Sequence, residues 1–315
     1  MQAYRYHSTG PDARPALEEV PPPPLGAGEL LVRVRYASLN PVDWKIATGH
    51  FRLLVRGGFP RTMGSDFSGE LVEVGAGLDG WRTGEPVMGF VDPFRRAHGT
   101  FAGLVPVPAP FVARRPPQVD ARLGGALPCV GVTAVALCNL AQVGQDSRVL
   151  VNGASGGVGH IALQVAKARG ARVTAVASAA RRDFVAALGA DQIVDYQSLP
   201  VERWPGGFDA VLDCVPSLPR GSHGHLLRRG GHYVSTLPTG ATYTVDPLAN
   251  RLGAVRRHAV MLRPDPAAVA ELVRYVSEGS LRCEIAGEFP IEETGRAIEL
   301  SRTGHVAGKL LIRVA

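Results

Sequence analysis

Cysteine and lysine are scarce in this chain of 315 residues. Its four cysteines, Cys129, Cys138, Cys214 and Cys283, lie far apart, and no two of them form a C-x-x-C pair. This spacing argues against a disulfide framework and against a structural zinc site. The first 15 residues also lack the apolar core of a signal peptide. We therefore expect a cytoplasmic protein.

Long apolar runs and blocks of like charge are missing as well. No stretch reaches the roughly 18 apolar residues of a membrane-spanning helix. The formal net charge is +6, but lysine occurs only at positions 45, 167 and 309, and the arginines are scattered. The sequence thus predicts neither a nucleic-acid partner nor a membrane partner. The length and the hydrophobic content of 45% fit a globular protein of two domains.

Residues 148–178 contain the most informative pattern in the chain. The apolar run 149–151 predicts a buried strand, a glycine cluster follows it, and the apolar residues of 161–168 share one face of a predicted helix. A second β-rich run covers 173–176. Strand, glycine turn, helix and strand within about 30 residues form a dinucleotide-binding unit, whose turn and helix start hold the pyrophosphate. The residues predicted to do so are Ala154, Ser155, Gly156, Gly157, Val158 and Gly159.

The residues after the second strand indicate which dinucleotide is bound. An NAD site usually carries Asp or Glu about 20 residues after the glycines, where it binds the ribose 2′-hydroxyl. Here Ser178, Arg181 and Arg182 occupy that region, and the first acid is Asp183. Because guanidinium groups bind phosphate by charge-assisted hydrogen bonds, Ser178 and Arg181 predict NADPH rather than NADH. The alternative is that the two arginines begin a solvated helix.

The remaining sequence divides into two kinds of structure. Residues 1–123 are rich in Gly and Pro and predict short strands over 30–36, 70–75 and 85–90. Residues 121–143 predict a helix, after which predicted strands at 192–194, 209–213 and 231–235 follow in the helix-strand alternation of a doubly wound parallel sheet. A further strand over 258–262, a helix over 266–278 and a final strand over 308–314 complete the prediction. The fold class is therefore α/β.

Six short segments occur in an order that is known from one protein family. They are residues 40–45 (NPVDWK), 64–69 (GSDFSG), 126–134, 154–159, 188–191 (LGAD) and 304–309 (GHVAGK). Together they resemble the medium-chain dehydrogenase/reductase superfamily, in its zinc-independent quinone oxidoreductase-like branch. The resemblance implies a GroES-like catalytic domain over 1–123, a Rossmann NADPH-binding domain over 124–264, and a segment over 265–315 that returns to the catalytic domain. It further implies an active site in the cleft between the domains, and a homodimer.

The same resemblance implies a reaction without a metal. Zinc-dependent relatives carry a cysteine in the stretch that corresponds to 40–43, and a His-Glu pair where this chain has Ser65 and Asp66. Without those thiolate and imidazole ligands, no three-ligand catalytic zinc site is expected.

Further cofactor residues follow from the resemblance. Tyr196 would lie near the adenosine end, and Lys309 would close over the nicotinamide. The other residues expected on the nicotinamide side are Thr133, Val215, Ser235 and Thr236. Packing roles for Thr133 and Tyr196, and a strand-end charge for Lys309, are the alternatives.

The proton donor is where the chain departs from the family pattern. Several enoyl-reducing relatives carry a tyrosine eleven residues after the position of Asn40, and here that residue is Phe51. Lys45 matches a lysine of alkenal- and quinone-reducing relatives, and a lysine can steady an enolate oxygen or pass a proton. Lys45 and Asn40 are therefore the predicted catalytic residues, with Asn40 bonded to the nicotinamide ribose or to the substrate. The alternative for Lys45 is a solvated position on a helix. His50 is a second candidate acid, and the donor itself stays open.

The expected activity is NADPH-dependent reduction of a quinone or an α,β-unsaturated carbonyl compound by hydride transfer. One alternative is a reductase of enoyl thioesters or of a biosynthetic intermediate, which the lack of a positioned acid at Phe51 disfavours. The other is an NADPH-binding sensor or structural protein with little turnover.

Overall fold

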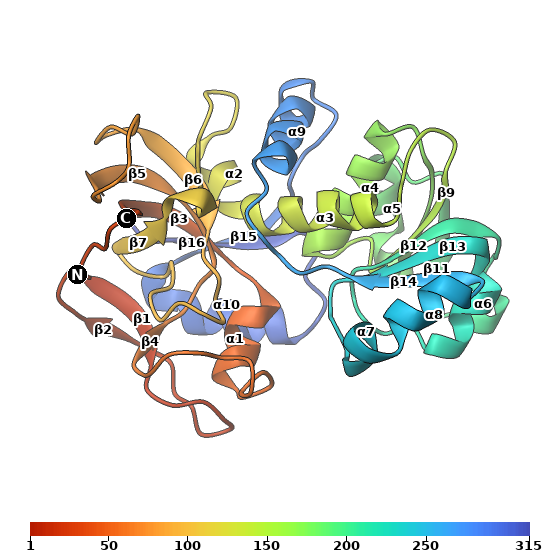
Figure 1. The fold of residues 1–315 in the computed structure, drawn as a ribbon, viewed down its shortest axis with the longest axis horizontal. Coiled ribbons are helices and arrows are strands. Elements are labelled where there is room, and N and C mark those ends of the chain that lie inside the picture. The colour runs from red at the N-terminus through yellow and green to blue at the C-terminus, as the bar shows by residue number, and fades with distance from the viewer. The chain divides into compact units, whose positions relative to one another are not determined.

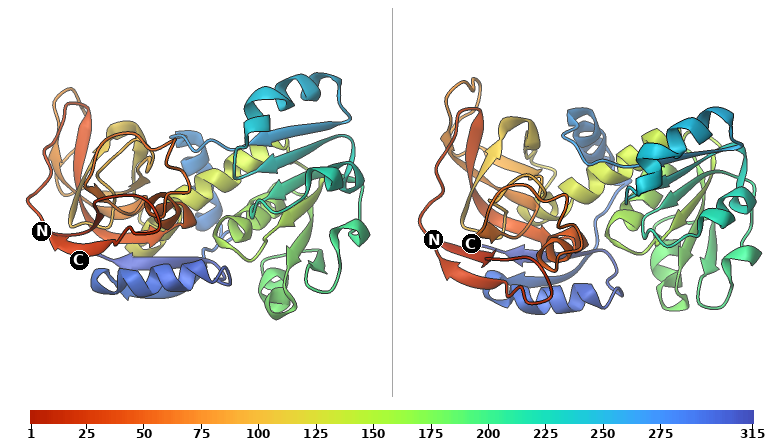
Figure 2. Two further views of the ribbon diagram at one scale, coloured as in Figure 1. Left: turned by 90° about the horizontal axis from the view of Figure 1, so that it is seen from below. Right: turned by 60° about the horizontal axis from the view of Figure 1, so that its bottom comes forward.

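The computed structural model describes residues 1–315, apart from the side chain of Leu252. The chain forms two compact units. The first unit joins Met1–Cys129 with Cys283–Ala315, and the second unit is Val130–Arg282. Both chain termini therefore belong to the first unit (Figure 2). The first unit is built mainly of antiparallel strands and the second contains a parallel sheet, which confirms the α/β prediction.

The first unit contains two sheets. The smaller has the strand order β2-β1-β4, and the larger has the order β15-β16-β3-β5-β6-β8, with β7 paired to β3 (Figure 1). The strands are β1 (Gln2–Tyr6), β2 (Ala16–Glu19), β3 (Glu29–Leu39), β4 (Arg61–Thr62), β5 (Asp66–Val74), β6 (Pro86–Phe90), β7 (Leu104–Pro108), β8 (Val112–Arg114), β15 (Ile285–Pro290) and β16 (Lys309–Arg313). The helices are α1 (Pro41–Ala47), α2 (Ala121–Ala126) and α10 (Thr294–Arg302), with the 3₁₀ turns η1 (Ala109–Phe111) and η5 (Ile291–Glu293).

Strand β3 is the centre of the larger sheet. Its alternating residues Leu30, Val32 and Val34 are fully buried, as the two-residue period of a strand with one face on the core requires. β3 pairs with β16 on one side and with β5 on the other, and both pairings are antiparallel. Helix α10 lies beside β1 (Figure 2), and a Cβ added to Gly295 would lie 3.4 Å from the hydroxyl oxygen of Tyr4.

The second unit is organised around one six-stranded sheet. All its strand pairs are parallel, in the order β11-β10-β9-β12-β13-β14. The strands are β9 (Arg148–Asn152), β10 (Arg172–Ala177), β11 (Gln192–Asp195), β12 (Phe208–Asp213), β13 (Leu227–Ser235) and β14 (Val255–Ala259). The helices are α4 (Gly157–Ala168), α5 (Arg182–Ala187), α6 (His223–Leu226), α7 (Gly240–Thr244), α8 (Asp246–Leu252) and α9 (Pro266–Ser277), with η2 (Ala179–Arg181), η3 (Val201–Arg203) and η4 (Arg220–Ser222). Helix α3 (Pro128–Leu140) begins two residues before this unit does.

The strand order reverses between β9 and β12. From β9 the chain continues outward through β10 and β11, and it then returns to the other side of β9 with β12. Because every strand is parallel, all carboxyl ends meet at one edge of the sheet. The crevice beside such a reversal is where open α/β sheets bind ligands.

Two sequence predictions about helices and strands were wrong in their limits. The single helix predicted over 121–143 is two helices, α2 and α3, because Pro128 lacks the backbone N–H that a helix interior needs but suits a first turn. The strand predicted over 258–262 is β14, which lies three residues earlier, where Val255 pairs with Gly231 of β13.

The two units meet at 129/130 and 282/283, whereas the predicted domain limits are 123/124 and 264/265. Helix α2 packs on β3 and β5, where Gly125 touches Tyr36, so the first unit extends to Cys129. Helix α9 and the residues after it are held in the second unit by an ion pair between Arg169 and Glu271, with 3.0 Å between nitrogen and oxygen. Among the described residues, no helix is long and apolar enough to cross a bilayer.

Candidate functional site

The predicted cofactor residues of the second unit lie at the carboxyl ends of consecutive strands. Ala154 to Gly159 follow β9, Ser178 follows β10, Tyr196 follows β11 and Val215 follows β12, while Ser235 ends β13. Parallel pairing places these ends along one sheet edge, at the reversal of strand order. Thr133 is the exception, because it lies buried in α3.

The glycine turn is shaped by close backbone contacts. Gly153 takes the left-handed conformation, with φ of 71°, so the residue in this strained position precedes Ala154. Ala154 is therefore tolerated where a glycine is usual, and its N–H donates to the carbonyl of Val176 at 3.0 Å. A side chain on Gly159 would place its Cβ 2.0 Å from the carbonyl oxygen of Gly153. Only glycine lets the start of α4 pack this closely on the turn.

The start of α4 offers backbone donors to an anion. The residue before the helix is Gly156, which has no side chain to cap the first N–H groups. These groups and the helix dipole attract negative charge. The buried His160 lies one turn on, with Nδ1 2.9 Å from the carbonyl of Gly156. A carbonyl only accepts, so Nδ1 carries the proton.

The end of β10 carries a hydroxyl and a guanidinium but no acid. Ser178 is half-buried at the start of η2, and its carbonyl accepts the N–H of Arg181 at 2.9 Å. This turn brings the backbones of Ser178 and Arg181 together. The first acid, Asp183, is exposed in the first turn of α5. The end of β10 therefore carries a hydroxyl and a guanidinium, two kinds of group that bind phosphate.

A buried carboxyl at the end of β12 was not identified from the sequence. Asp213 accepts hydrogen bonds from Asn152 of β9 at 2.7 Å and from the hydroxyl of Tyr233 at 2.6 Å. Burial raises the pKa of Asp213, and these donors oppose that effect. The network ties β9 to β12 at the reversal. A polar residue at the end of each strand, in an otherwise apolar run, is the pattern that would have indicated it.

Val215 and Thr236 extend this edge. A side chain on Gly153 would lie 2.2 Å from Cγ2 of Val215, so Val215 packs directly on the glycine turn. The hydroxyl of Thr236 lies 3.4 Å from the carbonyl of Cys214. The structure thus places Val215 on the glycine turn and Thr236 beside the residue before Val215.

The predicted catalytic Asn40 lies in a buried polar network of the first unit. The ammonium of Lys309 donates to Asn40 Oδ1 at 2.6 Å and to the carbonyl of Leu39 at 3.3 Å. Asn40 Nδ2 donates to Asp66 at 2.8 Å, and the Ser38 hydroxyl donates to the same oxygen at 2.8 Å. Lys309 was predicted to lie over the nicotinamide, and here its side chain is 2% exposed and engaged by these groups.

A second buried carboxyl, that of Asp43, is hydrogen-bonded to the backbone of Asn40. It accepts from the Asn40 N–H at 2.8 Å and from the Ser65 hydroxyl at 2.5 Å. Burial raises the pKa of Asp43 to about 7, the two hydrogen bonds lower it, and the nearby Asp66 raises it. Asp43 and Asp66 were not predicted as site residues. Their place in the segments NPVDWK and GSDFSG was the available indication.

Lys45 does not join this network. It lies in the last turn of α1, and its ammonium is 5.6 Å from the ring centre of Trp44, a cation–π contact. Phe51 packs edge-to-face on Phe94 with 5.6 Å between ring centres, and His50 Nδ1 lies 3.0 Å from the hydroxyl of Thr48. The two groups considered as proton donors, Lys45 and His50, therefore both lie at the carboxyl end of α1 or just after it.

The described residues contain no group of three or more His, Cys, Asp or Glu side chains arranged to hold a metal ion. The region where zinc-dependent relatives carry their ligands holds Asn40, Ser65 and Asp66. The ammonium of Lys309, 3.5 Å from Asp66, would repel a divalent cation there. These residues do not fit a catalytic zinc site.

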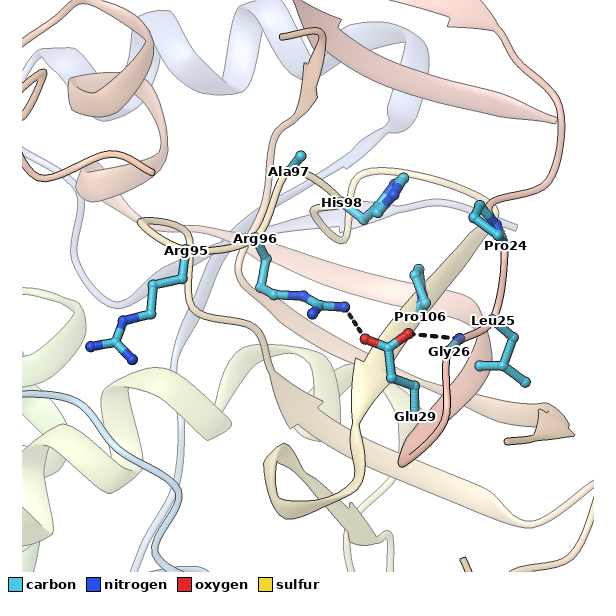
Figure 3. A pocket seen from close by; sticks show the side chains of 9 residues that line it. All are labelled: Pro24, Leu25, Gly26, Glu29, Arg95, Arg96, Ala97, His98 and Pro106. Carbon is cyan, nitrogen blue, oxygen red and sulfur yellow. Dashed lines mark hydrogen bonds and ion pairs between the residues drawn. The ribbon is translucent and has the colours of Figure 1, made fainter. Parts of the chain in front are cut away.

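A separate pocket of about 370 Å³ opens between the start of β3 and the segment before β7. Its lining includes Glu29, which pairs with Arg96 and accepts the N–H of Gly26 at 3.0 Å (Figure 3). The charged groups at its centre are thus already matched within the protein. None of the predicted site residues lines it.

Comparison with protein-family models supports the two-part reading of the chain. The model of the alcohol dehydrogenase GroES-like domain matches residues 26–117. The model of the zinc-binding dehydrogenase family matches residues 188–312.

Individual proteins match over nearly the whole chain. The chain is 32% identical to the chloroplast envelope quinone oxidoreductase homolog of Arabidopsis thaliana, over 99% of this chain and 98% of that protein. It is 29% identical to the mitochondrial NAD(P)H oxidoreductase RTN4IP1 of Homo sapiens, over 91% and 82%. The solved structure of the quinone oxidoreductase from Coxiella burnetii superposes with a TM-score of 0.88 at 30% identity, covering 100% of this chain and 99% of that one.

Proposed function

Because the chain belongs to the medium-chain dehydrogenase/reductase superfamily, in its quinone oxidoreductase-like branch, and is an NAD(P)H-dependent oxidoreductase, we propose that it uses NADPH. It reduces quinones or α,β-unsaturated carbonyl compounds, without zinc. The observation that carries the proposal is the row of predicted cofactor residues along the carboxyl edge of the parallel sheet.

NADPH fits the groups found along this edge. The uncapped start of α4 binds the pyrophosphate, and Ser178 and Arg181 bind the 2′-phosphate. Tyr196, 48% exposed beyond β11, contacts the adenosine end. Val215, Ser235, Thr236 and Thr133 line the nicotinamide side. When bound, the cofactor supplies the hydride.

The residues of the first unit act on the substrate oxygen. Reduction of a conjugated carbonyl compound or a quinone places negative charge on an oxygen, and donors aimed at that oxygen lower the barrier. Lys45 and Asn40 are the proposed donors, Lys45 by its ammonium and Asn40 by its amide N–H. Because Phe51 cannot donate a proton, Lys45 or solvent completes the reaction by protonating the product.

We propose a reaction without zinc because the residues in the corresponding region are not available as zinc ligands. Asn40, Ser65 and Asp66 are engaged in buried hydrogen bonds beside the Lys309 ammonium. We expect elemental analysis of the purified protein to find no stoichiometric zinc, and chelation to leave turnover unchanged. Stoichiometric zinc whose removal abolishes turnover would contradict this part.

The first experiment is turnover of NADPH, followed by the near-ultraviolet absorbance of reduced nicotinamide. A panel of quinones, enones and enoyl thioesters serves as acceptors, with NADH as the control cofactor. We expect turnover of quinones or enones with NADPH and little with NADH. Turnover of enoyl thioesters alone would select the biosynthetic alternative, and tight NADPH binding without turnover would select the sensor. Preference for NADH would contradict the role of Ser178 and Arg181.

The proposed partner is therefore a small conjugated carbonyl compound or quinone, and we propose a homodimer that light scattering can test. The cytoplasmic location stays a prediction from the sequence. The names of the two curated relatives assign those proteins to the chloroplast envelope and to mitochondria.

A further inference from the structure

The strand register of the first unit brings three charged or polar residues side by side. Leu310 of β16 pairs with Leu39 of β3, so Lys309 lies next to Asn40, just beyond the end of β3. Ser38 of β3 pairs with Asp66 of β5 on the opposite side. Asn40 is therefore flanked by an ammonium from one neighbouring strand and by a carboxyl from the other.

The chemistry of these two neighbours determines how the Asn40 amide is turned. An ammonium only donates, so the group 2.6 Å from Lys309 Nζ must be the amide oxygen. Burial raises the pKa of Asp66, and the Lys309 ammonium and the hydrogen-bond donors around the carboxyl oppose that effect. Asp66 Oδ2 already accepts the Ser38 hydroxyl, so the group 2.8 Å from this acceptor must be the amide nitrogen. A flipped amide would place its nitrogen against the ammonium and its oxygen against the carboxylate. Both contacts would be repulsive.

The holding groups are themselves fixed. Lys309 is 2% exposed and Asp66 is 0% exposed, and their charged atoms lie 3.5 Å apart. Asp66 Oδ1 also accepts the N–H of Cys129 at 2.6 Å, and Ser38 donates to Oδ2. Lys309 has the Leu39 carbonyl as a further acceptor. Because buried charges keep their hydrogen-bond partners, neither group is free to turn with the amide.

From this arrangement we infer that Lys309 and Asp66 are positioning residues that hold Asn40 as a hydrogen-bond donor toward the substrate oxygen. Asp66 takes one of the two Nδ2 protons, which leaves the second for the substrate. The inference rests on the proposed function and deepens it, because it assigns Lys309 to Asn40 rather than to the nicotinamide. It also selects the substrate as the partner of Asn40.

This orientation matters for the reaction class. A quinone or an enone gains negative charge on its oxygen as it accepts the hydride, and a donor stabilises that charge. The amide oxygen in the same place would repel it. A pair of opposite charges on either side of Asn40 thus ensures that the donor end is the one presented.

The test that needs no turnover is the NMR signal of the Asn40 side-chain amide, identified by its loss in Asn40→Asp. We expect slow hydrogen exchange of this amide in the native protein. Lys309→Met should raise its exchange rate about tenfold or more, because the amide can then turn and open. Lys309→Arg, which still donates to Oδ1, should preserve the signal. Lys167→Met removes a lysine that pairs with Asp191 in the second unit, and it serves as the matched control.

Lys309→Met leaves the Asp66 charge buried and unpaired, which destabilises the fold. Lys309→Met combined with Asp66→Asn removes both charges, and it should show the same fast exchange. An Asn40 signal as slow in both variants as in the native protein would overturn the inference.

The kinetic test is a double-mutant cycle. Lys309→Met should lower kcat by roughly 10²-fold with a smaller change in KM, because misplacing a reacting group costs about that much. In an Asn40→Ala background the same substitution should have no further effect on kcat, since Lys309 acts through Asn40. Independent, multiplying effects would assign Lys309 a role of its own and overturn the inference. If the native protein turns over none of the acceptors, the proposed function fails, while the NMR comparison still decides the positioning role.

Discussion

Ionisation of the buried Asp43 should weaken the first unit as the pH rises. Burial raises the pKa of this carboxyl from an ordinary value of 3.8 to about 7. At about 1.4 kcal/mol per pKa unit, the ionised group costs the folded protein about 4 kcal/mol. The folded state holds the proton more tightly than the unfolded chain does. The contribution of Asp43 to the free energy of unfolding is therefore highest below pH 4, falls between pH 4 and pH 7, and stays low above that window.

Asp43→Asn removes this titration. The amide oxygen of the variant can still accept the Asn40 N–H, and its nitrogen can donate to the Ser65 hydroxyl, so the hydrogen bonds of the site are preserved. Between pH 5 and pH 8 the variant should gain roughly 2–3 kcal/mol of stability relative to the native protein, because only the native protein then acquires the buried charge. Asp183→Asn, which changes an exposed acid in the second unit, is the control and should leave the pH dependence unchanged.

Urea unfolding followed by tryptophan fluorescence measures this difference. Trp44 and Trp81 lie in the first unit and Trp204 in the second, so a Trp204→Phe background reports on the first unit alone. The difference in unfolding free energy between the protein with native Asp43 and the Asp43→Asn variant is then compared at pH 5, 6, 7 and 8. A difference that stays constant across this range would refute the reasoning, because it would mean that Asp43 does not titrate there.

Three further predictions concern the cofactor and the reaction. Arg181→Ala should raise the KM for NADPH about 10- to 100-fold and leave that for NADH unchanged, since it removes charge-assisted bonds to the 2′-phosphate; steady-state kinetics check this against Arg182→Ala, and equal effects on both cofactors would contradict it. Lys45→Ala should lower kcat by roughly 10²-fold or more at unchanged thermal stability, and an unchanged rate would remove Lys45 from the mechanism. Gly159→Ala should abolish NADPH binding in a fluorescence titration, because its Cβ would lie 2.0 Å from a backbone oxygen. At Gly144, outside the turn, nothing lies within 4 Å of an added Cβ, so Gly144→Ala is the control and should bind NADPH normally. Tight binding by Gly159→Ala would show that the turn relaxes.

The cofactor-binding half of the fold was readable because its information is local. An apolar run, a glycine turn and an amphipathic helix follow one another within residues 149–168, and the structure places β9, the turn and α4 there. The helix predicted over 121–143 failed for a local reason as well. Pro128 indicates the start of a second helix, since proline starts a helix more readily than it continues one.

The polar network around Asn40 could not be read in the same way. Its members come from β3, α1, β5 and β16, and Lys309 lies 269 residues from Asn40 in the chain. Each of them alone is an ordinary polar residue at the end of an apolar run. Their hydrogen bonds depend on which strands become neighbours, and on the register between them.

The sequence by itself therefore determined the α/β class, the dinucleotide turn and the residues that follow each parallel strand, because period, glycine placement and strand ends are properties of short segments. Only the tertiary structure decided that Asp43 and Asp66 are buried, and that Lys309 faces Asn40. Antiparallel pairing of β16 with β3, and of β3 with β5, brings together residues from distant parts of the chain. Strand pairing also buries these residues, and burial shifts the pKa of their carboxyl groups. No short segment of the sequence specifies that burial.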